Sequence, residues 1–245
     1  SDDASRRLFD VWQKYLKHAF VYLFDIPKIS TEEAIMRYKL ETESLIQRVE
    51  NIFKVKISEN ALRDAAKTLN ITRGLLNSLH ELRKSGSCSI KSNEFLEIMK
   101  LAMITPKELF NEKLKQVLKE IKSQNSDKSN DCPRILLTGS FQDQSWLTDS
   151  IDEFGGNVVC EDICTRVRYF ANPVDESNKD ILYAISKRYL TKPPCARMVE
   201  LDRRFSHIHS LVKEFDIQGV VYYMLKFDDP YLFEFPEVKQ YLRDN

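Results

Sequence analysis

The sequence predicts an α/β fold, in which a lobe built on a parallel sheet follows a largely helical segment. Three short apolar runs carry this prediction, because each is typical of a buried strand that ends in a turn. The runs are residues 134–140, 157–162 and 217–225. Amphipathic stretches long enough for crossover helices separate them, as parallel strands require. Since parallel strands end at one edge of a sheet, we expect Gly139, Asp162 and Asp228 to share a rim there.

Helical periodicity dominates residues 30–124 and accounts for the helical segment. Ser30 or Thr31 is the expected N-cap of the first helix, and Gly74, inside the second, suggests close backbone packing against a neighbour. The expected helices cover residues 30–53, 58–86, 93–104 and 107–121. Residues 123–131 are rich in Ser, Asn, Asp and Lys, and we expect a solvated linker there.

The N-terminal residues begin with a helical stripe, and the continuous apolar run 19–24 then predicts a strand that stops before Pro27. This strand either joins the later sheet or ends a first α/β lobe whose earlier part is absent; we prefer the second interpretation, because only 18 residues precede the run. The expected domains are residues 1–29, the end of a first lobe; 30–124, a helical linking region; and 125–245, a second α/β lobe.

Composition excludes several classes of partner. The 37 basic and 37 acidic residues give a formal net charge of zero, without a long run of one sign, so nucleic acid is not an expected partner. No stretch approaches the roughly 20 apolar residues of a membrane span, and the first residues lack the order of a signal peptide. The five cysteines are an odd number without a C-x-x-C pair, which favours a reducing, cytoplasmic location.

The turn after the first run is a candidate anion site. Gly139 and Ser140 follow a strand, and a helix expected over 142–154 would aim backbone N–H groups at a phosphate or carboxylate. The simpler interpretation, that the glycine only serves the turn, stays open.

Residues 161–168 form a second polar group, with two carboxylates, a thiol and two guanidiniums just after a strand. In one interpretation Arg168 or Arg166 pairs with an anionic ligand. In the other these charged groups form an internal salt bridge, and Cys164 is a small buried cysteine that serves packing.

Cys195 precedes a helix expected over 196–215, where a thiolate is favoured and can ligate a metal, although most single cysteines have no such role. His207 and His209 are two residues apart on that helix, so they face different directions and cannot share a metal.

Several motifs together resemble the 2-hydroxyacyl-CoA dehydratase family, which includes the benzoyl-CoA reductase iron–sulfur subunits. The most specific is Lys-Phe-x-Asp-Pro-Tyr-Leu-Phe-Glu-x-Pro-Glu-Val-Lys over 226–239. The others are Leu-Leu-Thr-Gly-Ser over 136–140, Glu-Asp-x-Cys over 161–164 with Arg168, Arg-Tyr-Leu-x-x-Pro-x-Cys over 188–195, and Gly-Val-Val from Gly219. They occur in the family's order over most of the chain.

The resemblance implies a subunit of a heterodimer whose halves each contain two Rossmann-like or flavodoxin-like lobes around a 4Fe–4S cluster. In that family a separate ATP-hydrolysing activator delivers one electron, which reaches an acyl-CoA thioester and permits radical dehydration or reduction, a chemistry of anaerobic metabolism. On this basis Gly139, Ser140, Asp162 and Arg168 are expected to bind substrate. The expected metal ligands are Cys164, Cys195 and Asp228.

The chain departs from the family pattern in three ways. Asp228 stands where the family usually has cysteine, and a carboxylate is a harder ligand than iron–sulfur sites generally use. Arg166 stands where the family often has glycine. The family's first lobe and the last strands of its second are expected to be missing.

Two other interpretations stay open. A paralogue without a cluster would have a structural or assembly role, which Asp228 favours. A nucleotide-binding domain of flavodoxin type would carry a flavin, which the short Thr-Gly-Ser turn disfavours.

Overall fold

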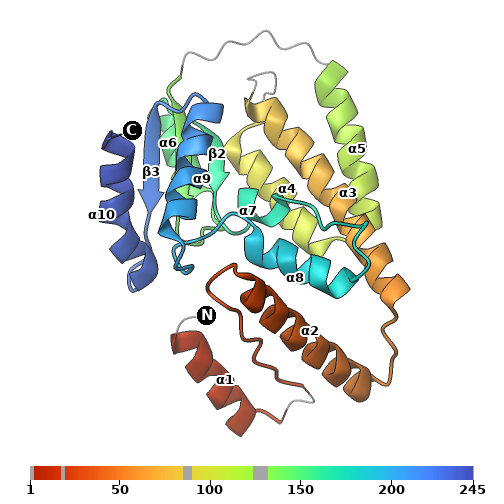
Figure 1. The fold of residues 1–245 in the computed structure, drawn as a ribbon. Helices are drawn as coiled ribbons and strands as arrows, with labels where there is room; N and C mark the ends of the chain where they lie inside the picture. Colours follow the sequence, from red (N-terminus) through yellow and green to blue (C-terminus); the bar gives the residue numbers. More distant parts are fainter. Residues whose placement is uncertain (1–2, 18–19, 85–89, 124–131, 245) are drawn as a thin grey trace. The chain divides into compact units, whose positions relative to one another are not determined.

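A computed structural model gives the structure of residues 3–17, 20–84, 90–123 and 132–244 (Figure 1). The chain divides into two compact units. The N-terminal unit is Ser1–Lys67 with Val174–Thr191, and the sheet unit is Thr68–Pro173 with Lys192–Asn245. The expected domains, 1–29, 30–124 and 125–245, stay a prediction.

The sheet unit confirms the α/β prediction. Its three strands are β1 (Arg134–Gly139), β2 (Asn157–Asp162) and β3 (Gly219–Tyr223), and they form a parallel sheet in the order β2-β1-β3. Thr138 pairs with Asp162 on one side of β1, and Gly139 pairs with Tyr223 on the other. The C-terminal ends of the strands therefore lie at one edge, as the sequence predicts.

Helices cover both faces of this sheet. The helices wholly within this unit are α4 (Ser92–Ile104), α5 (Lys107–Ser123), α6 (Trp146–Glu153), α7 (Val167–Phe170), α9 (Leu201–Glu214) and α10 (Asp229–Asp244). Alternate side chains of β1 face opposite ways, so Leu136 joins one apolar cluster and Leu137 another. The cluster around Leu137 includes Leu147 and Ile151 of α6.

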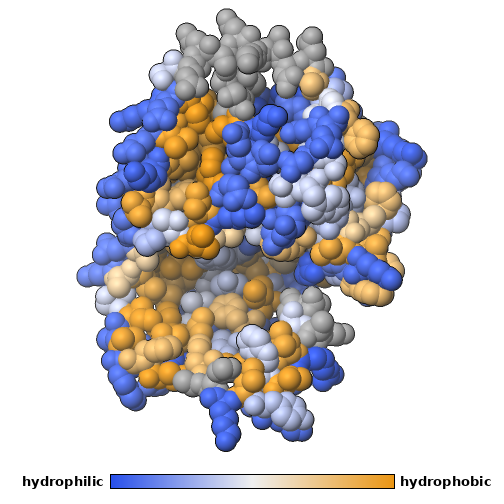
Figure 2. All heavy atoms as spheres, turned by 180° about the vertical axis from the view of Figure 1, so that it is seen from behind, coloured by the Kyte–Doolittle hydropathy of each residue, from blue (hydrophilic) through white to orange (hydrophobic). Residues whose placement is uncertain are grey.

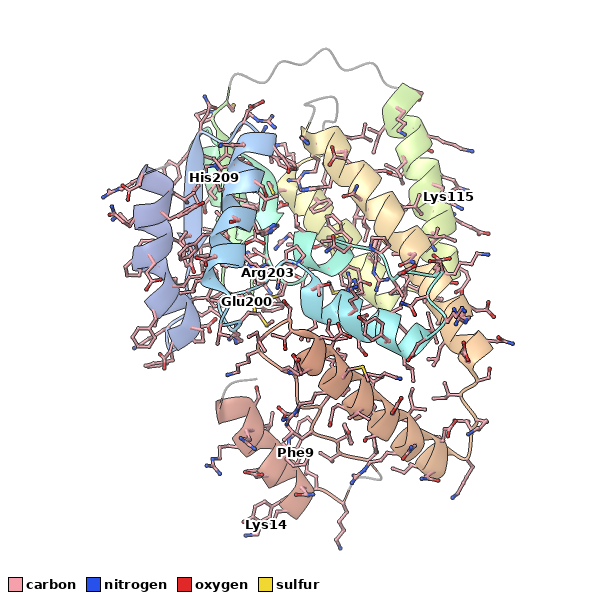
Figure 3. The ribbon with its side chains drawn as sticks, in the orientation of Figure 1. Phe9, Lys14, Lys115, Glu200, Arg203 and His209 are labelled. Carbon is pink, nitrogen blue, oxygen red and sulfur yellow. The ribbon has the colours of Figure 1, made fainter. Side chains whose placement is uncertain are left out.

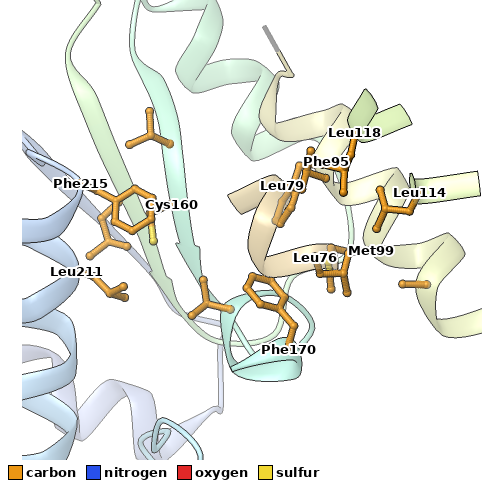
Figure 4. Packing of buried hydrophobic residues seen from close by; sticks show 14 of the residues in the cluster. Leu76, Leu79, Phe95, Met99, Leu114, Leu118, Cys160, Phe170, Leu211 and Phe215 are labelled. Carbon is orange, nitrogen blue, oxygen red and sulfur yellow. The ribbon is translucent and has the colours of Figure 1, made fainter. Parts of the chain in front are cut away.

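The larger cluster packs the other helices against the opposite face (Figure 4). Its buried members include Leu76, Leu79, Phe95, Met99, Cys160, Phe170 and Phe215. The pairing of β1 with β2 shifts by one residue after Ile135, so that Leu136 pairs with Cys160 and Val159 is the extra residue of a bulge. Both Val159 and Cys160 consequently join the larger cluster.

A buried ion pair fixes α3 (Glu59–Lys84) to β2. Both Nη atoms of Arg83 donate to the carboxylate of Glu161, at 2.7 and 3.0 Å, and Nη2 also donates to the Val158 carbonyl at 2.6 Å. The Ser92 hydroxyl donates to the same carboxylate, and the Arg83 guanidinium lies 4.4 Å from the centre of the Phe95 ring. Burial raises the pKa of Glu161, but Arg83, Arg166 and the Ser92 hydroxyl together outweigh it and hold that pKa below its ordinary value.

The N-terminal unit contains α1 (Asp3–Tyr15), α2 (Glu32–Phe53) and α8 (Ile181–Thr191), with the start of α3. Thr31 is the N-cap of α2, as expected: its hydroxyl accepts from the Ala34 amide. Helix α2 packs against α8, where Lys39 donates to Asp180 at 2.6 Å. Apolar residues gather on the surface of this unit (Figure 2), and its exposed large residues include Leu8, Val11, Trp12 and Tyr15.

The expected strand over 19–24 is wrong for its described part, because residues 20–24 are in no helix or strand. They run along α2 instead, with Phe24 5.1 Å from Tyr38 between ring centres and the Tyr22 hydroxyl donating to Glu41 at 2.7 Å. An apolar run becomes a strand only when another strand satisfies its backbone groups, and the described residues place none beside it.

The starts of two helices differ from those expected. Helix α6 begins at Trp146 rather than 142, and α9 begins at Leu201 rather than 196. Helix α10, which no periodicity predicted, accommodates Pro236 in its interior. Nearly all of the expected linker over 123–131 lies outside the described residues. None of the described helices is long and apolar enough to cross a membrane.

We expect Gly74→Ala to stabilise the protein. Gly74 does not pack closely against a neighbour, since a Cβ built there meets nothing within 4 Å. Alanine in an exposed helix interior is favoured over glycine by about 0.5–1 kcal/mol. Urea unfolding should show a gain of that size. A loss of stability would mean that the site tolerates no side chain.

His80 should make stability depend on pH. It is 4% exposed, and burial lowers its pKa to about 3 from an ordinary 6.5. Between these two pH values His80 is protonated in the unfolded chain but stays neutral in the folded one. The free energy of unfolding therefore decreases as the pH falls. Lowering the pH from 7 to 5 should reduce the free energy of unfolding by about 2 kcal/mol through His80 alone.

His80→Phe, which keeps the aromatic packing, should remove that part of the pH dependence. Urea unfolding of both proteins at pH 7 and pH 5 measures the difference. Identical pH dependence in the two proteins would contradict the assignment to His80.

Candidate functional site at the C-terminal edge of the sheet

The rim begins at the end of β1, where Gly139 has a φ of 123°. A Cβ there would lie 2.0 Å from the Tyr223 carbonyl oxygen, so only glycine fits beside β3. The Ser140 amide donates to the same oxygen at 2.9 Å. The turn interpretation therefore explains the glycine, and this amide already has a backbone acceptor.

Residues 141–145 are a loop, because α6 starts at Trp146, so Gly139 and Ser140 are not at a helix N-terminus. Arg166 holds the loop: its Nη1 donates to the Gln142 carbonyl and its Nη2 to the Gln142 side chain, both at 3.2 Å. Arg166 is fully buried, and its position at the family's usual glycine thus gives the loop an anchor.

Asp162 is the centre of the rim. It is fully buried and receives five hydrogen bonds or ion pairs through its side chain. Arg168 donates through Nε to Oδ1 at 2.8 Å and through Nη2 to Oδ2 at 3.1 Å, and Arg204 donates through Nη1 to Oδ2. The Thr138 hydroxyl donates to Oδ2 at 2.9 Å, and His207 Nε2 lies 3.2 Å from Oδ1. Of the two interpretations of residues 161–168, the structure shows the internal salt bridge, between Asp162 and Arg168, but Cys164 is exposed and not the buried packing residue of that interpretation.

These charges decide the ionisation of the site. Burial alone would raise the pKa of Asp162, but Arg168 and Arg204 hold it well below its ordinary value. Burial alone would lower the pKa of Arg168, but the negative charge of Asp162 has the larger effect in total, so the pKa of Arg168 is raised. All three groups are therefore charged at neutral pH.

Three members of the network, Arg204, Glu234 and Tyr222, were not among the site residues expected from the sequence. Arg204 Nε donates to Glu234 Oε1 at 3.0 Å, and the Tyr222 hydroxyl donates to Glu234 Oε2 at 2.5 Å. Helical periodicity is the sequence signal that could have identified Arg204, because Arg204 lies on the same buried stripe of α9 as Ile208 and Leu211. A charged residue on an apolar stripe indicates a buried partner.

The two rim thiols lie around Tyr231. Arg168 Nη1 donates to the Tyr231 hydroxyl at 3.1 Å and to Cys164 Sγ at 3.5 Å. Burial raises the pKa of Tyr231, and the nearby Cys164 and Cys195 raise it further against the opposing effect of Arg168. Cys164 is exposed and Cys195 half-buried, so a ligand can reach both.

Cys195 does not stand at a helix N-terminus. It opens a turn closed by the Met198 amide, which donates to the Cys195 carbonyl at 2.9 Å, and α9 begins only at Leu201. The helix dipole acts within about the first turn, so it does not explain a reactive thiolate here.

Asp228 is the third expected metal ligand, and protein groups bind both its oxygens. Arg197 Nη2 donates to Oδ1 at 2.7 Å, and the Ser140 hydroxyl donates to Oδ2 at 2.7 Å. Among the residues whose placement is described, no three His, Cys, Asp or Glu side chains are arranged to hold a metal ion. The metal roles of Cys164, Cys195 and Asp228 stay predictions.

The two histidines of α9 face different directions, as expected. His207 points to Asp162, whereas the His209 ring lies 5.9 Å from that of Tyr241. Figure 3 labels His209 on this helix, with Arg203 and Glu200 at its start, where Arg203 Nη1 donates to Glu200 at 2.8 Å.

Removing the central charge should destabilise the sheet unit strongly. We expect Asp162→Asn to cost about 3–5 kcal/mol, because Arg168 and Arg204 would stay buried without their counter-charge. Urea unfolding measures it. The matched control is Asp10→Asn, whose side chain is 51% exposed and pairs with Arg7; it should change stability by less than about 1 kcal/mol. Equal effects of both substitutions would contradict the central role of Asp162.

Comparison with known proteins gives one family. The model of the family "2-hydroxyglutaryl-CoA dehydratase, D-component" matches residues 1–245. One of the benzoyl-CoA reductase subunits of Thauera aromatica is 24% identical over 99% of this chain and 64% of its own length. The (R)-phenyllactyl-CoA dehydratase beta subunit of Clostridium sporogenes is 24% identical over 83% of this chain and 53% of its own.

The beta subunit of (R)-2-hydroxyglutaryl-CoA dehydratase from Acidaminococcus fermentans is 22% identical, over 88% of this chain and 58% of its own length. The chain thus spans between half and two thirds of these relatives. The match over the whole chain agrees with the motifs at the rim, and the protein belongs to the 2-hydroxyglutaryl-CoA dehydratase D-component family.

Proposed function

We propose that this chain works as a subunit of an enzyme of the 2-hydroxyacyl-CoA dehydratase or benzoyl-CoA reductase type. The observation that carries the proposal is the family match over residues 1–245, and three of the motifs, over 136–140, 161–164 and 226–239, lie at the C-terminal ends of β1, β2 and β3. The reaction would be dehydration or reduction of an acyl-CoA thioester, dependent on ATP and an activator protein.

A homologous second subunit is the proposed partner. The matched relatives are described as subunits, one of a reductase and two of dehydratases, which supports a multi-component enzyme. The four cysteines in the described residues are free thiols, which supports the proposed cytoplasmic location.

The residues present fit a 4Fe–4S cluster only in part. Such a cluster takes four thiolates, and this rim offers Cys164 and Cys195, while Asp228 is paired with Arg197. The described residues therefore do not form a complete cluster site, and the remaining ligands would come from other residues of the chain or from the partner. When bound, a cluster would supply one-electron chemistry.

The other rim residues are proposed to frame the site. Asp162 and Arg168 are at most 1% exposed and bind each other, so they shape the floor beneath a substrate rather than reach into solvent. Ser140 and Gly139 join β1 to β3 at the same edge. A direct substrate contact by these four residues stays a prediction.

Iron and sulfide analysis tests the proposal. The full chain would be produced anaerobically with its homologous partner subunit, and iron, sulfide and visible absorbance measured per complex. We expect a brown complex for the unmodified protein. Cys164→Ser and Cys195→Ser should each lower iron affinity at least tenfold, because each removes a ligand. Cys132→Ser, at the opposite end of β1, should change nothing.

Activity is measured with 2-hydroxyacyl-CoA or aromatic acyl-CoA substrates, ATP and the activator. A complex that stays colourless after reconstitution contradicts the iron–sulfur proposal. Such a result would favour the structural or assembly role, for which the occupied carboxylate of Asp228 is the supporting observation.

A further inference from the structure

Asp228 connects three separate segments of the sheet edge. Ser140 comes from the loop after β1, Asp228 from the turn after β3, and Arg197 from the stretch before α9. The Ser140 hydroxyl also accepts from the Leu225 amide at 3.2 Å. The side chain of Asp228 is 10% exposed and that of Arg197 is 30% exposed, so the ion pair is partly shielded from water.

Arg197 is held from a second side as well. Its guanidinium lies 5.4 Å from the centre of the Tyr231 ring, and Tyr231 is fully buried. Arg197 is also the third residue of the turn that Cys195 opens and the Met198 amide closes. Whatever fixes Arg197 therefore fixes the turn that carries the thiol.

The other side of the ion pair is a strained turn. The Asp228 amide donates to the Leu225 carbonyl at 3.1 Å, and Phe227, the third residue of that turn, has a φ of 69°. Phe227 is 82% exposed, so packing does not force this left-handed backbone. A bulky residue keeps such a conformation only where its surroundings impose it, and the next residue, Asp228, is bound through both carboxylate oxygens.

We propose that Asp228 is a positioning residue for Cys195 and not a metal ligand. Its carboxylate, with Ser140 and Arg197, forms a clasp that holds the Cys195 turn against the ends of β1 and β3. Both carboxylate oxygens are already bound within the protein, and the neighbouring positive charge of Arg197 opposes a metal cation at this point. The clasp is a property of the metal-free chain, so it holds or fails independently of the proposed function.

The test is the alkylation rate of Cys195 in the metal-free full chain. N-ethylmaleimide labelling under reducing-agent-free conditions, followed by mass spectrometry of peptides, gives a rate for each cysteine. We expect Asp228→Asn and Arg197→Gln each to raise the Cys195 rate about three- to fivefold, because the turn opens more often without the ion pair. The double variant should be no faster than the quicker single variant, since both remove one interaction.

Two controls distinguish a local clasp from general loosening. Asp228→Glu keeps the charge and should restore the Cys195 rate to within about twofold of the unmodified chain. Cys132, half-buried before β1, should label at the same rate in every variant. A parallel rise at Cys132 would show global destabilisation and would overturn the proposal.

Iron binding separates the clasp from a ligand role. If Asp228 ligated iron, Asp228→Asn would reduce bound iron while the Cys195 rate of the metal-free chain stayed unchanged, and Arg197→Gln would affect neither. That pattern, or single effects that multiply in the double variant, would overturn the proposal. Faster Cys195 labelling in both single variants without a further rise in the double variant would support it.

Discussion

The sheet edge depends on one buried carboxylate that balances two buried guanidiniums. Asp162 ends β2, Arg168 follows it in the chain, and Arg204 arrives from α9, 42 residues away. Charges removed from water are tolerated only in such pairs, so the position of α9 over the sheet is set by electrostatics as well as by apolar packing. The thiols, Tyr231 and the clasp all rest on this arrangement, because Arg168 contacts both Tyr231 and Cys164.

The sheet and its rim could be predicted because their signals are local. Each strand is a short apolar run, each run ends in a turn, and parallel strands must end at one edge, which brings Gly139, Asp162 and Asp228 together without knowledge of packing. Asp162 and Arg168 are only six residues apart in the chain, so an internal salt bridge in this stretch was one of the interpretations that the sequence offered. Three of the family motifs, over 136–140, 161–164 and 226–239, contain these same positions.

The remaining features depend on contacts that the sequence does not display. Residues 20–24 have the composition of a strand, but strand formation needs a neighbour, and these aromatic side chains pack on α2 instead. The helix after Cys195 was placed too early because a turn, closed by one hydrogen bond, delays its start. Asp228 has the chemistry of a metal ligand and the surroundings of an ion pair, and only distances distinguish the two.

The shared burial of Asp162, Arg168, Arg204 and Glu234 also constrains how this family can diverge. The two carboxylates and two guanidiniums cancel one another inside the protein, so losing one leaves an uncompensated charge. A substitution at one of these four positions is therefore tolerated only if another of them changes with it. Across homologous sequences the four should be inherited, or replaced by apolar residues, as a coevolving set.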